Sequence, residues 1–404
     1  MAQPRVASVA VGEVTTIVPV RDNPDGLERC LAALGDTPTI VVDDASGDAV
    51  SHRRIAQRHG ATYIRRDQNG GPGAARMSGL AVVESELVAF VDSDLEVRSG
   101  WLSGLCGHFA DPAVVAVAPR VRSRRSSGLL ASYEREHSPL DLGGSPGQVG
   151  PGRIISYVPT AALVARTAAI TAVDGFDPDL RWGEDVDLIW RLADAGGVVR
   201  YEPTVEVVHD PRPDWWAWFN QRRRYGASAA ALAKRHGRKV APARCSRWSL
   251  AAWLTAAAGR PAVGAATAVG STAALARKLD SLPHPAVEAA RLAGRGHLLA
   301  GLGLARATSR VWWPPVLLLA ALFPSRRKAI AATILTPAVI DWAKGRRPAE
   351  AVPAIAIRTI DDMSYGLGVW QGAVAERTIM PLLPDLADWP GRRSPVEDTT
   401  VSGR

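Results

Sequence analysis

Cysteine is scarce in this 404-residue sequence, which contains only Cys30, Cys106 and Cys245. No two of them have the close spacing of a metal-binding or redox pair, which argues against a disulfide scaffold and a structural zinc site. A reducing compartment such as the cytosol fits this low content. The first twelve residues also lack a cationic segment followed by an apolar core, so we expect no signal peptide.

Uninterrupted apolar runs of about 20 residues, the length that spans a bilayer, are absent as well. The second half is nevertheless rich in Ala, Gly, Leu and Trp, with its most apolar stretches at 250–276, 311–323 and 329–340. The last two flank a basic turn at 326–328, which predicts a hydrophobic hairpin on the cytoplasmic side of the cell membrane. A helical domain with an alanine-rich core is the alternative interpretation.

Two familiar phosphate-binding fingerprints are missing. No glycine fingerprint follows the first strand-like segment, 14–20, which argues against a nicotinamide-dependent enzyme. The segment 69–76 (Asn-Gly-Gly-Pro-Gly-Ala-Ala-Arg) lacks the Gly-Lys-Ser/Thr of a Walker loop. It could still present backbone N–H groups to a phosphate at a helix N-terminus, with Arg76 reaching a nucleotide. A purely structural turn is the alternative.

The composition is that of a folded protein, with 47% hydrophobic and 22% charged residues and a formal net charge of +8. Short apolar runs at 14–20, 39–42, 62–64 and 87–91 alternate with helical patterns at 26–35, 51–59 and 73–83. This alternation predicts an α/β fold with a mostly parallel twisted sheet flanked by helices, and with ligands at the carboxyl ends of the strands.

The domain organisation follows from where this pattern ends. The α/β pattern resumes at 154, continues to about 211 and is followed by a helical segment, after which the composition changes. We predict a flexible N-terminus at 1–13, a catalytic domain at 14–240, a helical, membrane-associated region at 241–391 and a disordered tail at 392–404.

Asp92-Ser93-Asp94 ends the apolar run 87–91. In extended chain, residues i and i+2 point the same way, so the two carboxylates can converge on a hard cation, Mg²⁺ or Mn²⁺, that also bridges phosphate oxygens. A solvated turn is the alternative, but the position at a strand end favours the metal site. His209, which follows the strand-like 205–208, is a candidate third ligand or else a structural histidine.

Asp43-Asp44-Ala45-Ser46 closes the second strand. At this edge of an α/β sheet a carboxylate can grip a base or ribose, and Asp44 is our candidate. Capping of the next helix by Asp44 or Ser46 is the alternative, and both roles can coexist. Pro19 and Arg21 stand at the equivalent end of the first strand and could flank the same base.

A third acidic group, Glu184, Asp185 and Asp187, stands at the start of a predicted helix, directly after Trp182-Gly183. Helix capping and the helix dipole account for one or two of these carboxylates. The remaining acid can remove a proton from an attacking hydroxyl group. Asp185 is our candidate base and Glu184 the second choice, with Trp182 and Asp187 as candidate acceptor contacts.

Three tryptophans at 215, 216 and 218 precede the basic run 222–224. Arg222 could neutralise a leaving diphosphate, and an exposed basic helix face is the alternative. The tryptophans could belong to the core or stack on the faces of sugar rings.

Together these segments resemble the family 2 glycosyltransferases of the GT-A fold. The matching motifs, in family order, are 19–23, 42–46, 71–76, 92–94 and 184–188, within a resemblance that covers about 14–240. The resemblance implies that Asp44 holds the base, that Asp92, Ser93 and Asp94 serve the ribose and the metal, and that Asp185 is the catalytic base. It also implies inversion, by which an α-linked donor gives a β-glycoside.

A narrower resemblance, to the mycofactocin-system glycosyltransferases of actinobacteria, extends along nearly the whole chain. The matching segments are 132–142, 155–161, 182–192, 313–323 and 361–370. This resemblance implies UDP-glucose as donor, a peptide-derived redox cofactor as acceptor, and no nucleic-acid partner. The family usually carries a further segment before the first strand, where this chain has only about a dozen residues.

Other functions are compatible with part of these motifs. The same chemistry could serve a lipid or cell-wall glycan acceptor. A nucleotidyltransferase would require a glycine-rich loop and a lysine directly after the first strand, and residues 21–24 do not supply them. A membrane-associated protein that binds a nucleotide sugar without catalysis is the alternative of another class.

Overall fold

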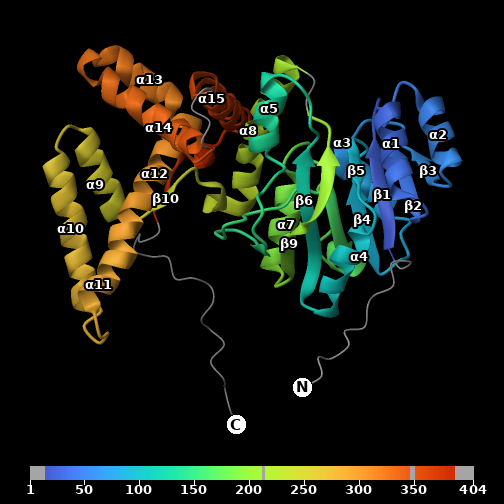
Figure 1. Cartoon of the computed structure of the whole chain (residues 1–404), viewed down its shortest axis with the longest axis horizontal. Helices are drawn as coiled ribbons and strands as arrows, with labels where there is room; N and C mark the ends of the chain where they lie inside the picture. The colour runs from blue at the N-terminus through green and yellow to red at the C-terminus, as the bar shows by residue number, and fades with distance from the viewer. Residues whose placement is uncertain (1–13, 212–213, 346–350, 387–404) are drawn as a thin grey trace, which may run out of the picture. The chain divides into compact units, whose positions relative to one another are not determined.

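The computed structural model describes residues 14–211, 214–345 and 351–386, which fall into two compact units divided between Trp218 and Phe219 (Figure 1). The predicted N-terminal segment 1–13 and tail 392–404 lie outside the described residues. The domain boundary at residue 240 stays a prediction.

A mixed nine-stranded sheet forms the centre of the first unit, within residues 14–211, in the order β3-β2-β1-β4-β8-β6-β9-β5, with β7 paired to β9 (Figure 1). The strands are β1 (Val14–Val20), β2 (Thr39–Asp43), β3 (Thr62–Arg65), β4 (Leu87–Val91), β5 (Leu95–Val97), β6 (Val114–Ser123), β7 (Gly147–Val149), β8 (Ala162–Arg166) and β9 (Val198–His209). The β1–β4 part is parallel as predicted, but β8 runs antiparallel to both β4 and β6, and β5 and β7 run antiparallel to β9. The prediction of a mostly parallel sheet is therefore corrected to a mixed one.

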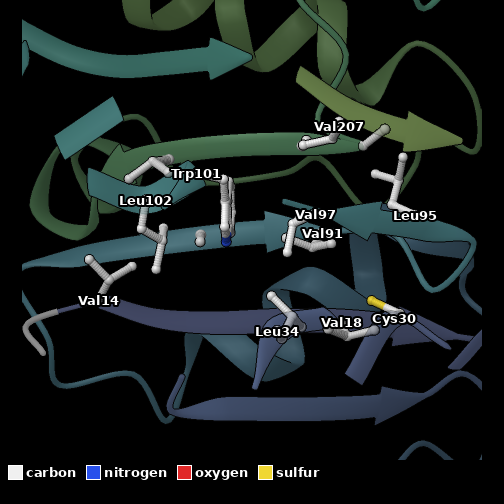
Figure 2. Close-up of a cluster of buried hydrophobic side chains, with 14 of the residues drawn as sticks. Val14, Val18, Cys30, Leu34, Val91, Leu95, Val97, Trp101, Leu102 and Val207 are labelled. Carbon is white, nitrogen blue, oxygen red and sulfur yellow. The ribbon is translucent and has the colours of Figure 1, made fainter. Parts of the chain in front are cut away.

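Helices pack on both faces of this sheet. They are α1 (Pro24–Leu34), α2 (Ala49–Arg58), α3 (Gly71–Leu80), α4 (Trp101–Cys106), α5 (Leu129–His137), α6 (Thr167–Ala172) and α7 (Glu184–Asp194). On one face, Val14 and Val18 of β1 join Cys30 and Leu34 of α1 and Trp101 of α4 in a buried cluster (Figure 2). Successive strand residues point to opposite faces, so the odd-numbered positions of β1 meet α3 on the other side.

The approach of α3 to β1 depends on a glycine. A Cβ added to Gly79 would lie 2.7 Å from Cγ2 of Ile17, closer than packed atoms allow. Because β1, β2 and β4 are parallel neighbours, their carboxyl ends share one edge of the sheet. Arg21, Asp44 and Asp92 each follow one of these ends, and α3 lies beside them.

In its described residues, the second unit is helical apart from a short pairing of β10 (Arg244–Cys245) with β11 (Asp385–Leu386). Its main helices are the greater part of α8 (Trp215–His236), α9 (Arg247–Ala257), α10 (Pro261–Lys278), α12 (Arg295–Arg310), α13 (Trp313–Leu322), α14 (Arg327–Gly345) and α15 (Ala351–Ala375), with the shorter α11 (Pro285–Ala289). Backbones of α8 and α15 meet at glycines: a Cβ on Gly368 would lie 1.8 Å from the carbonyl oxygen of Arg223. A buried ion pair, Arg222 Nε to Asp361 Oδ1 at 2.9 Å, joins the same helices.

The hydrophobic hairpin predicted around 311–340 is corrected by the structure. Helix α13 has ten residues, about 15 Å of helix against a bilayer core of about 30 Å. Helix α14 contains Pro337 and carries charged residues at both ends. Throughout the residues that the structure describes, no helix combines the length and the apolar character needed to cross a membrane. The predicted hydrophobic hairpin and the membrane localisation that rested on it are therefore corrected.

Candidate active site

The segment Asp92-Ser93-Asp94 forms a turn that joins the buried strand β4 to the short strand β5. The Asp92 N–H donates to the Ala161 carbonyl at 2.8 Å, and the Leu95 N–H donates back to the Asp92 carbonyl at 3.0 Å. The carboxyl groups stay accessible, with side-chain exposures of 31% for Asp92 and 27% for Asp94. Asp92-Ser93-Asp94 is therefore an accessible turn at a strand end, and its predicted role in metal binding stays a prediction.

His209 is the last residue of β9 and meets this turn. Strand β5 pairs with β9 so that Leu95 lies opposite His209, which places Asp94 beside the imidazole. The distance from His209 Nε2 to Asp94 Oδ2 is 3.2 Å. Two of the predicted metal ligands are thus in contact, although no group of three or more His, Cys, Asp or Glu side chains in the described ranges is arranged to hold a metal ion.

Arg76, at 2% exposure, lies buried on α3 between two acidic segments. Its Nη2 donates to Asp92 Oδ1 at 2.6 Å, and its Nη1 donates to Glu184 Oε1 at 3.2 Å. The guanidinium group also lies over the ring of Phe176, 5.4 Å from its centroid. Arg76 therefore links the Asp92 turn to the start of α7, and its predicted contact with a nucleotide stays a prediction.

Helix α7 begins with Glu184 and Asp185. Burial, reinforced by the negative charge of Asp185 and opposed by Arg76, raises the pKa of Glu184 to about 7. Burial likewise raises the pKa of Asp185, whose Oδ1 accepts the Val186 N–H at 2.8 Å. A carboxylate with a raised pKa is a stronger base at neutral pH, so both candidates for the base lie in a suitable environment.

Asp44 is engaged by the loop that enters α3. Its carboxylate accepts the Gly70 N–H at 3.0 Å and the Gly71 N–H at 2.7 Å, and Arg66 Nε donates to it at 2.9 Å. Arg66 also donates to the Ala74 carbonyl at 3.0 Å, so it contacts the first turn of α3 as well. The sequence analysis missed Arg66, although its position just after β3, at the edge where the other candidates lie, was a usable signal.

The capping role that we considered for Asp44 or Ser46 belongs to Asp48, whose Oδ1 accepts the Ser51 N–H at the start of α2 at 3.1 Å. Asp43 instead fixes the turn that follows β2. This buried carboxylate accepts the Ser46 N–H at 2.8 Å and the Tyr63 hydroxyl at 2.7 Å. Consecutive strand residues point to opposite faces. The side chain of Asp43 therefore lies inside the turn, whereas that of Asp44 lies against the glycine loop. The contact of Asp44 with a base stays a prediction.

The remaining candidates lie in different settings. Pro19 is buried in β1, and Arg21 is exposed beside Asp22, with 3.5 Å between Arg21 Nε and Asp22 Oδ2. Trp182 is 38% exposed next to α7. Arg222 belongs to the second unit, where its Nε is bonded to Asp361.

Asp187 is 1% exposed and bonds to Arg191 Nε at 2.8 Å. Arg191 in turn donates to the carbonyl groups of Val173 and Gly175. Through Arg191, Asp187 helps to fix the turn before α7, and its predicted contact with an acceptor stays a prediction.

The geometry defines an acidic site at the carboxyl edge of an α/β sheet, and the comparisons give its class. The sequence model of the family described as glycosyl transferase family 2 matches residues 15–171. The chain is 39% identical over 386 residues to the pre-mycofactocin glycosyltransferase of Mycobacterium tuberculosis, covering 93% of this chain and 82% of that protein. The chain therefore belongs to glycosyl transferase family 2, together with that mycobacterial protein, and is a glycosyltransferase.

More distant relatives show weaker similarity. The glycosyltransferase AglE of Haloferax volcanii is 23% identical over 213 residues, covering 50% of this chain and 67% of that protein. Among solved structures, the mannosyltransferase PcManGT of Pyrobaculum calidifontis, in complex with GDP-Man and Mn²⁺, has a TM-score of 0.45 and 19% identity, covering 87% of this chain and 88% of that one. The TarS structure from S. aureus has a TM-score of 0.40 and 18% identity, covering 54% and 65%.

Proposed function

We propose that this chain transfers glucose from UDP-glucose, with inversion, to a peptide-derived redox cofactor of the mycofactocin type. The observation that carries the proposal is the 39% identity to the pre-mycofactocin glycosyltransferase, because it extends over 93% of the chain and far beyond the family segment 15–171. Similarity along the second unit as well as the first supports a shared acceptor in addition to shared chemistry.

A divalent cation, Mg²⁺ or Mn²⁺, is part of this proposal, with Asp94 and His209 as its protein ligands. Two adjacent ligands of an octahedral cation, each about 2.1 Å from the metal, lie about 3 Å apart. The 3.2 Å between Asp94 Oδ2 and His209 Nε2 fits that spacing. The cation would supply positive charge to the diphosphate oxygens of the donor. In this proposal Asp92, which Arg76 contacts through one oxygen, assists in binding the cation.

Asp185 is the proposed general base. The acceptor hydroxyl oxygen forms a bond to the anomeric carbon while the bond from that carbon to the diphosphate breaks, and UDP leaves. Asp185 takes the hydroxyl proton, and attack on the face opposite the diphosphate inverts the configuration. Asp185 is more exposed than Glu184, and it is not the carboxylate that is bonded to Arg76, which favours it over Glu184 for this step.

The test compares Asp185→Asn with Asp194→Asn, an exposed position at the other end of α7. We expect Asp185→Asn to lower turnover by roughly 100-fold to 10,000-fold, the usual contribution of a general base, while UDP binding by calorimetry stays within about twofold. Asp194→Asn should keep full turnover. Full activity of Asp185→Asn would contradict the assignment, and Glu184→Gln would then be the variant to examine.

The acceptor is tested separately by offering UDP-glucose with the peptide-derived cofactor precursor or with a lipid-linked glycan. Transfer to the cofactor precursor alone supports the proposal. Transfer to the lipid-linked glycan alone would contradict the proposed acceptor but not the proposed sugar transfer.

A further inference from the structure

Four charged side chains form a closed ring beside the Asp92–Asp94 turn. Arg29 of α1 lies 3.2 Å from Glu96 Oε1 through its Nε and 2.5 Å from Asp210 Oδ2 through its Nη2. Arg124, the first residue after β6, contacts Glu96 Oε1 through Nη2, and its Nε lies 2.6 Å from Asp210 Oδ1. Each arginine therefore holds both carboxylates, and the four residues come from four separate segments of the chain.

The ring is tied directly to the two proposed metal ligands. Glu96 stands two residues after Asp94 on β5, and Asp210 directly follows His209. The Asp210 N–H donates to the Asp94 carbonyl at 3.3 Å, and the Arg124 N–H donates to the His209 carbonyl at 2.8 Å. Two of the four ring residues, Asp210 and Arg124, thus also bond to the backbone of the two ligands.

This bracing matters because β5 is a weak support on its own. It has three residues and lies at the end of the sheet, where it pairs only with β9 among the strands in the described ranges. A strand that short adds few backbone hydrogen bonds, and an edge strand has a partner on one side only. Cross-links from α1 and from the end of β6 supply the missing restraint.

We infer that the ring of Arg29, Glu96, Arg124 and Asp210 positions Asp94 and His209 for the divalent cation. The inference rests on the proposed function, since that proposal identifies the two ligands. This role requires no contact between the four residues and the metal. They act as positioning residues, as partners outside the coordination sphere do at metal sites generally.

The positive charge of Arg124 and its positioning role predict opposite changes in Mn²⁺ affinity when Arg124 is replaced. A nearby positive charge repels a cation, so its removal alone would tighten binding of Mn²⁺. Loss of positioning would instead weaken binding. The sign of the change therefore distinguishes the two effects without any assay of glycosyl transfer.

The experiment titrates the full-length protein with Mn²⁺ in the presence of UDP, by calorimetry or by the electron paramagnetic resonance signal of free Mn²⁺. We expect Arg124→Gln to weaken Mn²⁺ binding by about 10-fold or more, the usual range for such partners, and Arg124→Lys to recover part of the loss. The matched control is Arg98→Gln. Arg98 directly follows β5, its side chain is 68% exposed, and its Nη2 lies 3.7 Å from Glu206 Oε2. The Arg98→Gln protein should bind Mn²⁺ as tightly as the wild type or slightly more tightly.

Unchanged or tighter binding by Arg124→Gln would overturn the inference. If that variant does not fold, Arg29→Gln, which opens the same ring from the exposed side of α1, must show the same weakening. Absence of Mn²⁺ binding by the wild type would instead refute the proposed metal site. Failure of the inference and failure of the proposed function are thereby distinguished.

Discussion

Loss of Arg76 should carry a large electrostatic cost in the first unit. Its guanidinium group is buried and bonded to Asp92 at 2.6 Å and to Glu184 at 3.2 Å. In Arg76→Met the similar length of the new side chain limits the cavity, so the cost comes mainly from two carboxylates that have lost their cation. Removing one partner of a buried pair costs about 3–5 kcal/mol. Because the Asp92 side chain is 31% exposed and water can replace part of the contact, we expect about 3 kcal/mol.

The pH dependence gives this prediction its sign. The pKa of Glu184 is already raised to about 7 in the folded protein, and the loss of Arg76 raises it further, whereas in the unfolded chain it stays near 4.3. A carboxyl group with a folded pKa above its unfolded pKa binds more protons in the folded state, so stability falls as pH rises. The gap between variant and wild type should therefore widen from pH 5 to pH 8.

The assay is urea unfolding of both proteins at pH 5 and pH 8 without added metal. Arg200→Met is the control, because Arg200 and Asp111 form an exposed pair at 3.4 Å, and such pairs contribute at most about 1 kcal/mol. An Arg76→Met protein as stable as the wild type at pH 8 would refute the reasoning. Equal destabilisation at both pH values would show that packing, rather than charge, is what Arg76 contributes.

Two further predictions concern the loop and the helices that surround these contacts. Asp44→Ala should lower the free energy of unfolding in urea by about 1–3 kcal/mol, because Gly70, Gly71 and Arg66 all lose their acceptor. The control, Asp48→Ala, removes an exposed cap of α2 and should cost less. Equal costs would contradict the role of Asp44 in anchoring the loop. Gly368→Ala should lower the free energy of unfolding by about 3 kcal/mol or more, because its Cβ would meet a backbone oxygen at 1.8 Å. The control, Gly270→Ala, lies on an exposed and open face of α10 and should raise the free energy of unfolding by about 0.5–1 kcal/mol. A Gly368→Ala protein as stable as the wild type would contradict the close packing of α8 and α15.

The first strands and helices of the fold could be predicted because each is encoded by neighbouring residues. The apolar runs that became β1 to β4 and the helical patterns between them need no information from distant parts of the chain. The antiparallel insertion of β8 between β4 and β6 depends instead on pairing between residues about 75 positions apart, such as Phe90 with Leu163. No local pattern distinguishes that arrangement from a continued parallel sheet.

The candidate site divides in the same way. Strand-end carboxylates could be found from their position after an apolar run, which is how Asp92 and Asp94 were chosen. Asp185 was chosen instead because the predicted helix starts with more acids than capping requires. The setting of Arg76 could not be found, because its partners Asp92 and Glu184 are 16 and 108 positions away. Whether a charged side chain faces a ligand or another side chain is decided by folding, and the sequence pattern around Arg76 is the same in both cases.

Product analysis after incubation with UDP-glucose, Mn²⁺ and the peptide-derived cofactor precursor tests the central claim most directly. Mass spectrometry should show the acceptor heavier by one or more anhydrohexose units, and the proton coupling of the new anomeric centre should show a β-linkage. Both signals should be lost with Asp185→Asn. An α-linked product would contradict inversion, and an unmodified acceptor in the presence of bound UDP-glucose and Mn²⁺ would contradict the proposed function.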